Sequence, residues 1–401
     1  MTNLLIAAGG GGDVITTTAV HGALHGPHAP ALVLTYAWER LTVDPVPGPR
    51  RASDFTGTDA AGPRLRLLTP DSAPVAPAGS LLPRLAADLS PRLGVLDPYD
   101  GAEGLAAQIA EAAAHCGAAR IDVVDVGGDI LAEGTEPTLR SPLGDALVLA
   151  ACARTGIPAT VHVAGPGLDC EIPEADVLRR LGGAPPALTL TAEHTRAVEH
   201  VFDWHPSEAS ALVTAAAHGV RGVCGIRDAA RPVTLSDASP RVHALPLARA
   251  LALNPLARAL HDTTTLAGAE AASVRVCGFS EIARERERAR NGTLRTDPRA
   301  RPHAPTAAQA PSGPPQSVAR PLADRFDAWS ARTARDGIQY VTTRRIREEL
   351  ALSEREFTEL RARRVSKEAA ETSADTGPLW PLCVPGADSE SARGPLTPQA
   401  P

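Results

Sequence analysis

Short apolar segments alternate with helix-length segments over the first 290 residues. This alternation is typical of a mostly parallel sheet with helices on both faces, because parallel strands need long crossover connections. The predicted strands are residues 4–8, 31–36, 121–126, 160–164, 188–191 and 220–224. Residues 101–115 and 142–155 are predicted helices. The sequence therefore predicts a doubly wound, Rossmann-like α/β fold.

The composition divides the chain into four parts. Residues 1–290 form the predicted α/β ligand-binding domain, and the proline-rich residues 291–320 are a predicted disordered linker. Residues 321–385 are a predicted small helical subdomain, followed by a disordered tail at 386–401. The subdomain contains two helices that could form a DNA-binding helix-turn-helix. We favour a subdomain packed on the core, because the chain offers no basic face.

Charge and residue usage exclude several classes of protein. The net charge of -6 argues against a nucleic-acid binder. The single lysine, Lys367, lies near the C-terminus, so a P-loop or a Schiff base with pyridoxal phosphate (PLP) has no candidate lysine in the core. Six cysteines without a CxxC pair and the lack of long apolar runs predict a cytoplasmic protein that does not enter a membrane. An oligomer is compatible with this composition.

A glycine-rich loop follows the first predicted strand. It contains Gly9, Gly10, Gly11, Gly12 and then Asp13. Glycines let a ligand approach the backbone, and N–H groups at a helix start bind anions. Asp13 is the predicted N-cap of a helix through residue 24. Asp13 would repel a bare phosphate, so we expect a metal ion or a sugar hydroxyl between Asp13 and the phosphate. The alternative is that the glycine-rich loop is a purely structural turn without a ligand.

The same loop disfavours NAD(P). The third glycine position of a dinucleotide fingerprint is occupied by Val14, and the acidic residue after the second strand, Glu39, comes late.

The connection after residues 121–126 is the strongest functional signal. Ser141, Pro142 and Gly156 delimit the next helix, so residues 127–140 form a long loop at a strand end, where α/β proteins bind ligands. Its glycines and charged residues, with the flanking aspartates, are Asp125, Gly127, Gly128, Asp129, Glu133, Glu136, Arg140 and Asp145.

These carboxylates suggest a site for cation or sugar binding and for acid-base catalysis. We expect Asp125 and Asp129 to bind Mg²⁺ or sugar hydroxyls and to take part in catalysis, with Asp145 or Glu136 as a general base. Asp122 should face the opposite side of the strand from Asp125. The alternatives are solvated loop charges at Glu133 and Glu136 and a helix-dipole role for Asp145.

A third loop repeats the glycine-carboxylate pattern. After residues 160–164 come Gly165, Gly167, Asp169 and Glu171. Three strand ends that carry glycine and carboxylate predict one shared ligand site. The segment holding Trp38, Glu39, Arg40, Asp44 and Arg50 suits either ring stacking and phosphate contact or a structural cover. We interpret His194, His200 and His205 as ordinary helix and loop histidines rather than zinc ligands.

Several of these segments together resemble a known family. They are "GGGGDV", "WERLTVDPVPGPR", "DVVDVGGDILAEGTEPTLRSPLGDALVLAA" and "GPGLDCEI". The chain resembles an archaeal and actinobacterial α/β family, a domain of unknown function, over about residues 1–290. The resemblance implies one fold but no reaction and no cofactor.

The leading hypothesis is an enzyme. It would act on a small polar, phosphorylated or nucleotide- or sugar-linked metabolite, as a transferase or hydrolase, in specialised-metabolite biosynthesis. One alternative is a ligand sensor that signals through its C-terminal helices. Another is an NAD(P)-dependent oxidoreductase.

Overall fold

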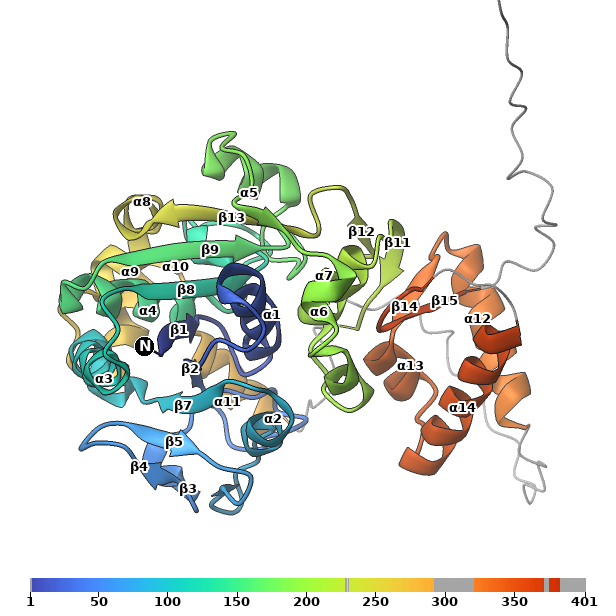
Figure 1. The fold of residues 1–401 in the computed structure, drawn as a ribbon, viewed down its shortest axis with the longest axis horizontal. Helices are drawn as coiled ribbons and strands as arrows, with labels where there is room; N and C mark the ends of the chain where they lie inside the picture. Colours follow the sequence, from blue (N-terminus) through green and yellow to red (C-terminus); the bar gives the residue numbers. More distant parts are fainter. Residues whose placement is uncertain (1, 228, 230, 292–320, 371–374, 383–401) are drawn as a thin grey trace, which may run out of the picture.

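The computed structural model describes residues 2–227, 229, 231–291, 321–370 and 375–382 (Figure 1). The predicted linker beyond Asn291 and the predicted tail at 386–401 lie outside the described residues. Among the described residues, no helix is both long and apolar enough to cross a bilayer.

The main sheet has nine strands in the order β10-β13-β9-β8-β1-β2-β7-β5-β4. Its five central strands are parallel: β9 (Ala159–Ala164), β8 (Ile121–Val126), β1 (Asn3–Ala7), β2 (Ala31–Tyr36) and β7 (Arg92–Leu96). Antiparallel strands extend both edges: β13 (Arg241–Pro246) and β10 (Leu188–Thr189) on one side, β5 (Arg66–Leu68) and β4 (Asp59–Ala60) on the other. The predicted α/β fold class is confirmed.

The strand order reverses beside β1. The chain runs from β1 outward through β2 to β7, and then returns to β8 on the other side of β1, where Ala7 pairs with Val124. The chain segments after β1 and after β8 therefore lead to helices on opposite faces of the sheet, α1 on one and α4 on the other. In open α/β sheets, ligands bind at this switch point.

Both faces of the sheet are covered because side chains alternate along each strand. Leu5 and Ala7 of β1 pack toward α1 (Asp13–His25), α2 (Leu82–Asp88) and α7 (Glu208–Ala217). Leu4 and Ile6 pack toward the opposite layer, which consists of α3 (Gly101–Cys116), α4 (Pro142–Thr155), α8 (Leu247–Leu253), α9 (Pro255–Leu260) and α10 (Leu266–Cys277). The remaining elements of this part are α5 (Glu174–Leu181), α6 (Ala192–Thr195), α11 (Glu281–Arg290) and a small sheet of β3 (Phe55–Thr56) and β6 (Ala73–Pro74).

A second sheet joins the C-terminal unit to the α/β part. Its order is β12-β11-β14-β15, with β12 (Val233–Leu235), β11 (Gly222–Gly225), β14 (Tyr340–Thr342) and β15 (Leu379–Pro381). Helices α12 (Leu322–Arg335), α13 (Thr343–Glu349) and α14 (Glu354–Ala370) pack on it around Trp329, Ile346, Phe357 and Trp380. Figure 1 shows this unit beside α6 and α7. The strand predicted at 220–224 belongs to this sheet and not to the main one.

Two details differ from the sequence analysis, and the bounds of α4 agree with it. Helix α1 starts at Asp13 itself, with Gly12 as its N-cap. Strands β7 and β13 were not predicted, because Gly94 interrupts one apolar pattern and Arg241 and His243 obscure the other. Helix α4 starts after Ser141 and ends at Gly156 in the left-handed conformation, as predicted.

Candidate functional site

The glycine loop lies at the switch point, between β1 and α1. None of its four glycines has a positive φ. Instead, a Cβ atom on Gly9 would lie 2.5 Å from the Asp13 carboxyl, and one on Gly12 would lie 2.7 Å from the Ser207 hydroxyl. Close packing therefore requires these glycines. The N–H groups of Gly10, Gly11 and Gly12 have no hydrogen-bond acceptor among the described residues.

The loops after β8 and β9 interlock through glycines. Gly127 has a φ of +116°, and a Cβ atom there would lie 2.1 Å from the Asp169 carboxyl carbon. The Gly167 N–H donates to the Gly127 carbonyl at 2.6 Å. Gly128 and Gly165 also have positive φ values. A strained backbone at these positions is tolerated only by glycine, and it brings Asp169 against the loop that carries Asp129.

Five carboxylates converge above β8 and β9. One oxygen from each of Asp125, Asp129 and Asp145 lies within 4.8 Å of the others, and the same holds for Asp129, Asp169 and Glu171. We call these five residues the carboxylate cluster. Asp129 belongs to both groups. The structure thus brings together carboxylates from the end of β8, the loops after β8 and β9, and the first turn of α4, as the shared-site prediction requires.

Burial dominates the electrostatics of the cluster. It raises the pKa of Asp125 to about 7, and it raises the pKa values of Asp129, Asp145 and Asp169 well above their usual range, with further contributions from neighbouring carboxylates. The Asp129 carboxyl and the amides of Ile130 and Gly128 lower the pKa of Asp125.

The oxygens of the cluster are only partly satisfied. Both Asp125 oxygens, Asp145 Oδ1 and Asp169 Oδ2 have no hydrogen-bond partner among the described residues. Buried carboxyls without donors are costly, and protons or a cation would relieve that cost.

Glu171 is the anchored member of the cluster. It accepts hydrogen bonds from the N–H groups of Arg140 and Ser141 at 2.7 and 3.0 Å, and from the Ser141 hydroxyl at 2.5 Å. The Ser141 side chain is therefore used here and does not cap α4. Arg140 also donates to the Asp169 carbonyl at 2.7 Å. These bonds fix the position of the third loop relative to α4.

Glu136 does not join the cluster. Its carboxyl pairs with Arg180 at 2.7 Å and accepts hydrogen bonds from the amides of Glu133 and Gly134. Although burial raises its pKa, these partners together lower the pKa of Glu136 below its ordinary value. The side chain of Glu136 is also buried, so it is not a solvated loop charge. This arrangement stabilises the long loop and makes Glu136 a poor general base.

Asp13 connects the glycine loop with the cluster. Burial and then the Asp125 carboxylate raise its pKa well above the ordinary value, whereas the Gly9 amide and Arg40 lower it. Its side chain therefore turns back toward Gly9 and lies within electrostatic range of Asp125.

Sequence reasoning missed one acidic neighbour of the cluster. Glu281 begins α11, and its Oε2 is buried with no hydrogen-bond partner among the described residues. Burial and then Glu285 raise the pKa of Glu281 well above its usual range. The negative charge of Glu281 in turn contributes to the raised pKa of Asp145. The segment from 281 to 290 is highly charged, which is typical of a solvent-exposed helix. Nothing in its local sequence predicts that Glu281 is buried beside the cluster.

Asp122 faces away from the cluster, as predicted. Its two oxygens contact His25 at 3.1 Å and His162 at 3.0 Å on the α1 side of the sheet. This paired carboxylate on the same strand is a natural control for Asp125.

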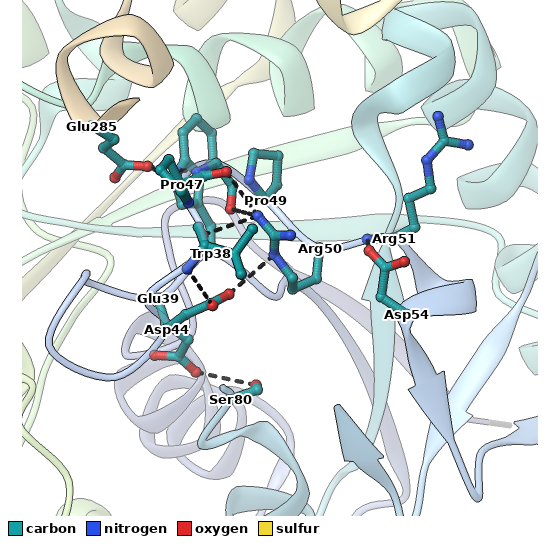
Figure 2. A network of polar contacts seen from close by, with 12 residues as sticks. Trp38, Glu39, Asp44, Pro47, Pro49, Arg50, Arg51, Asp54, Ser80 and Glu285 are labelled. Atoms are coloured by element: carbon teal, nitrogen blue, oxygen red, sulfur yellow. Dashed lines mark hydrogen bonds and ion pairs between the residues drawn. The ribbon is translucent and has the colours of Figure 1, made fainter. Parts of the chain in front are cut away.

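The segment after β2 forms a structural cover (Figure 2). Arg50 pairs with Asp44 at 3.0 Å and donates to the carbonyls of Val46, Pro47 and Gly48. The Trp38 indole N–H donates to Glu285 at 3.1 Å. These contacts use the polar groups of the segment internally and tie it to α11.

Two cavities lie away from the cluster. The larger, of about 170 Å³, is lined by residues that include Ala31, Arg92 and His115 at the opposite edge of the sheet. A smaller one lies between α7 and the C-terminal unit.

Comparison with known proteins identifies the family. The sequence model of a family described as a protein of unknown function, DUF1152, matches residues 4–289. The chain belongs to this family. No curated protein and no solved structure matches the chain. The match confirms the predicted resemblance.

Proposed function

We propose that this DUF1152 protein is a divalent-cation-dependent transferase or hydrolase. Its substrate would be a small polar metabolite that is phosphorylated or linked to a nucleotide or sugar. The observation that carries the proposal is the convergence of Asp125, Asp129 and Asp145, with buried unpartnered oxygens, at the switch point of the sheet.

The donor set fits a hard cation. Mg²⁺ prefers carboxylate and water oxygens and binds proteins through one or two carboxylates plus substrate phosphates. Asp125 and Asp129 would hold the ion. Asp145 lies within reach of the same position and would complete the site or accept a proton from a bound water.

Such an ion would supply two effects. It would lower the pKa of a bound water and stabilise negative charge that develops at a phosphoryl or glycosyl centre. The protein's own contribution would be orientation: Glu171 fixes the third loop, and the interlocking glycines fix Asp129 and Asp169. Glu281 and Asp13 would raise the negative field that attracts the cation.

Thermal-shift measurements test the cation first. Mg²⁺ or Mn²⁺ should raise the melting temperature of the wild type, since a ligand specific to the folded state stabilises it. D129N should abolish that rise, and the matched variant D122N should retain it. Hydrolysis of sugar phosphates and nucleotides by the wild type and by D129N then tests turnover. Equal turnover by the two would exclude the proposed role of Asp129.

A specific contact chain favours a second candidate, a ligand sensor. The Ser210 hydroxyl of α7 donates to the Gly12 carbonyl at 3.0 Å, and Glu208 of α7 bonds to the Thr342 hydroxyl of the C-terminal unit. Helix α7 thus touches both the glycine loop and that unit. If sensing is the function, deletion of residues 321–385 should abolish the output while ligand binding survives.

A further inference from the structure

His205 lies against the glycine loop from a different part of the chain. It follows the 3₁₀ helix Glu199–Asp203 and precedes α7. Its side chain is buried, with the residue 6 % exposed. The ring carbon Cε1 lies 3.5 Å from the position of a Cβ atom on Gly12. The imidazole therefore faces the start of α1.

The hydrogen bonding of His205 fixes its tautomer. The Ser207 N–H donates to Nδ1 at 3.2 Å, so Nδ1 is an acceptor and a neutral ring must carry its proton on Nε2. Burial and then Arg40 lower the pKa of His205 to about 3, which keeps the ring neutral near pH 7. Nε2 is buried and has no partner among the described residues. An N–H donor without an acceptor thus sits beside the glycine loop.

We propose that His205 Nε2–H and the N–H groups of Gly10, Gly11 and Gly12 bind a phosphate group of the substrate. This inference rests on the proposed function, which supplies the cation beside the phosphate. The four N–H donors themselves do not belong to the carboxylate cluster.

The donor set suits phosphate in particular. A phosphate offers several acceptor oxygens, and a helix start with free N–H groups favours an anion. Gly10–Gly12 lead directly into α1, a helix of 13 residues with Gly12 as its N-cap, so the positive end of the helix dipole lies at this loop. Arg40 adds positive charge close to both Asp13 and His205, because it lowers the pKa of each. Burial of a donor without a partner is costly, so an oxygen that accepts from Nε2–H would be stabilising.

Acidic neighbours set the position of the phosphate. Asp13 turns toward Gly9 and Asp125, and Glu39, near Gly11, accepts hydrogen bonds from the Leu81 amide and the Ser80 hydroxyl. A phosphate on Gly10–Gly12 would therefore lie close to the Asp13 carboxyl, which packs against Gly9. A cation held by Asp125 and Asp129 would offset that repulsion.

Titrations with inorganic phosphate and pyrophosphate test the site. We expect both anions to bind the wild type and H205Q, because the glutamine amide keeps a donor near the position of Nε2. H205F lacks the donor and should bind roughly tenfold more weakly or worse, the loss of a hydrogen bond to a charged group. H243F replaces another buried histidine, in β13, and should bind like the wild type.

The wild type also provides a test that needs no variant. In ¹⁵N-imidazole spectra, the Nε2–H resonance of His205 should shift on addition of phosphate. An unshifted resonance, or equal phosphate affinity in H205F and the wild type, would overturn the proposal. These titrations are run both in EDTA and in excess Mg²⁺, so the two proposals fail separately: loss of cation binding refutes the proposed function, and a wild type that binds phosphate in neither condition refutes this site.

Discussion

Neutralising Asp125 should stabilise the metal-free protein, and the size of the effect follows from burial. Asp125 is 1 % exposed, and burial raises its pKa from 3.8 to about 7. At roughly 1.4 kcal/mol per pK unit, ionising this group in the folded state costs up to about 4 kcal/mol. The fold favours the protonated form. The stability that this group contributes is therefore complete below about pH 4, is lost progressively as the pH rises from about 4 to 7, and is absent above pH 7.

D125N makes this cost measurable. The asparagine is neutral at every pH, so in EDTA at pH 8 the variant should be more stable than the wild type, by up to about 4 kcal/mol. At pH 5 the carboxyl is protonated in the folded wild type but already mostly ionised in the unfolded chain, so the two proteins should differ by only about 2 kcal/mol. Urea unfolding followed by circular dichroism gives both values.

Addition of Mg²⁺ should remove most of this difference. At a hundredfold excess over its Kd, a cation stabilises the wild type by about 3 kcal/mol, and D125N should gain little. The reasoning is refuted if D125N is less stable than the wild type at pH 8 in EDTA. It is also refuted if the difference between the two proteins is the same at pH 5 and pH 8.

Three further predictions concern the surroundings of the cluster. His162 and His25 outweigh burial and lower the pKa of Asp122, so D122N should lose about 1–3 kcal/mol at pH 7. This loss of stability should disappear as the pH falls through the lowered pKa of Asp122. Urea unfolding at pH 7 and at pH 3 measures it. G127A should destabilise the fold by about 2 kcal/mol or more, because its φ is +116° and its Cβ would strike Asp169; unchanged stability would exclude the tight contact. E171Q should weaken Mg²⁺ affinity at least about tenfold by calorimetry while its far-ultraviolet spectrum stays native.

The sequence predicted the elements of the fold that depend on local patterns. The strand at 31–36 is apolar except for Thr35, and the strand at 121–126 is apolar except for Asp122 and Asp125. Ser141, Pro142 and Gly156 mark both ends of α4. It also predicted one site for three glycine-carboxylate loops, because parallel strands place their carboxyl ends at one edge. The loops after β8 and β9 share the carboxylate cluster, and Asp13 of the first loop lies within electrostatic range of Asp125.

Other features depend on contacts that no local pattern encodes. The glycines at 9–12 are required by Asp13, Trp38, Leu82 and Ser207 rather than by φ. His205 and Glu281 reach the site from segments about 190 and 270 residues after the glycine loop, and each sits in an unremarkable local sequence. Glu136 looked like a catalytic candidate by spacing, but Arg180 from α5 pairs with it. Long-range pairing decides the role of each of these side chains.

Binding of Mn²⁺ followed by electron paramagnetic resonance tests the central claim most directly. The wild type should remove free Mn²⁺ from solution saturably, Mg²⁺ should displace it, and D129N should leave the free signal unchanged while D122N behaves like the wild type. A wild type that binds no Mn²⁺, or a D129N protein that binds it equally well, would contradict the account.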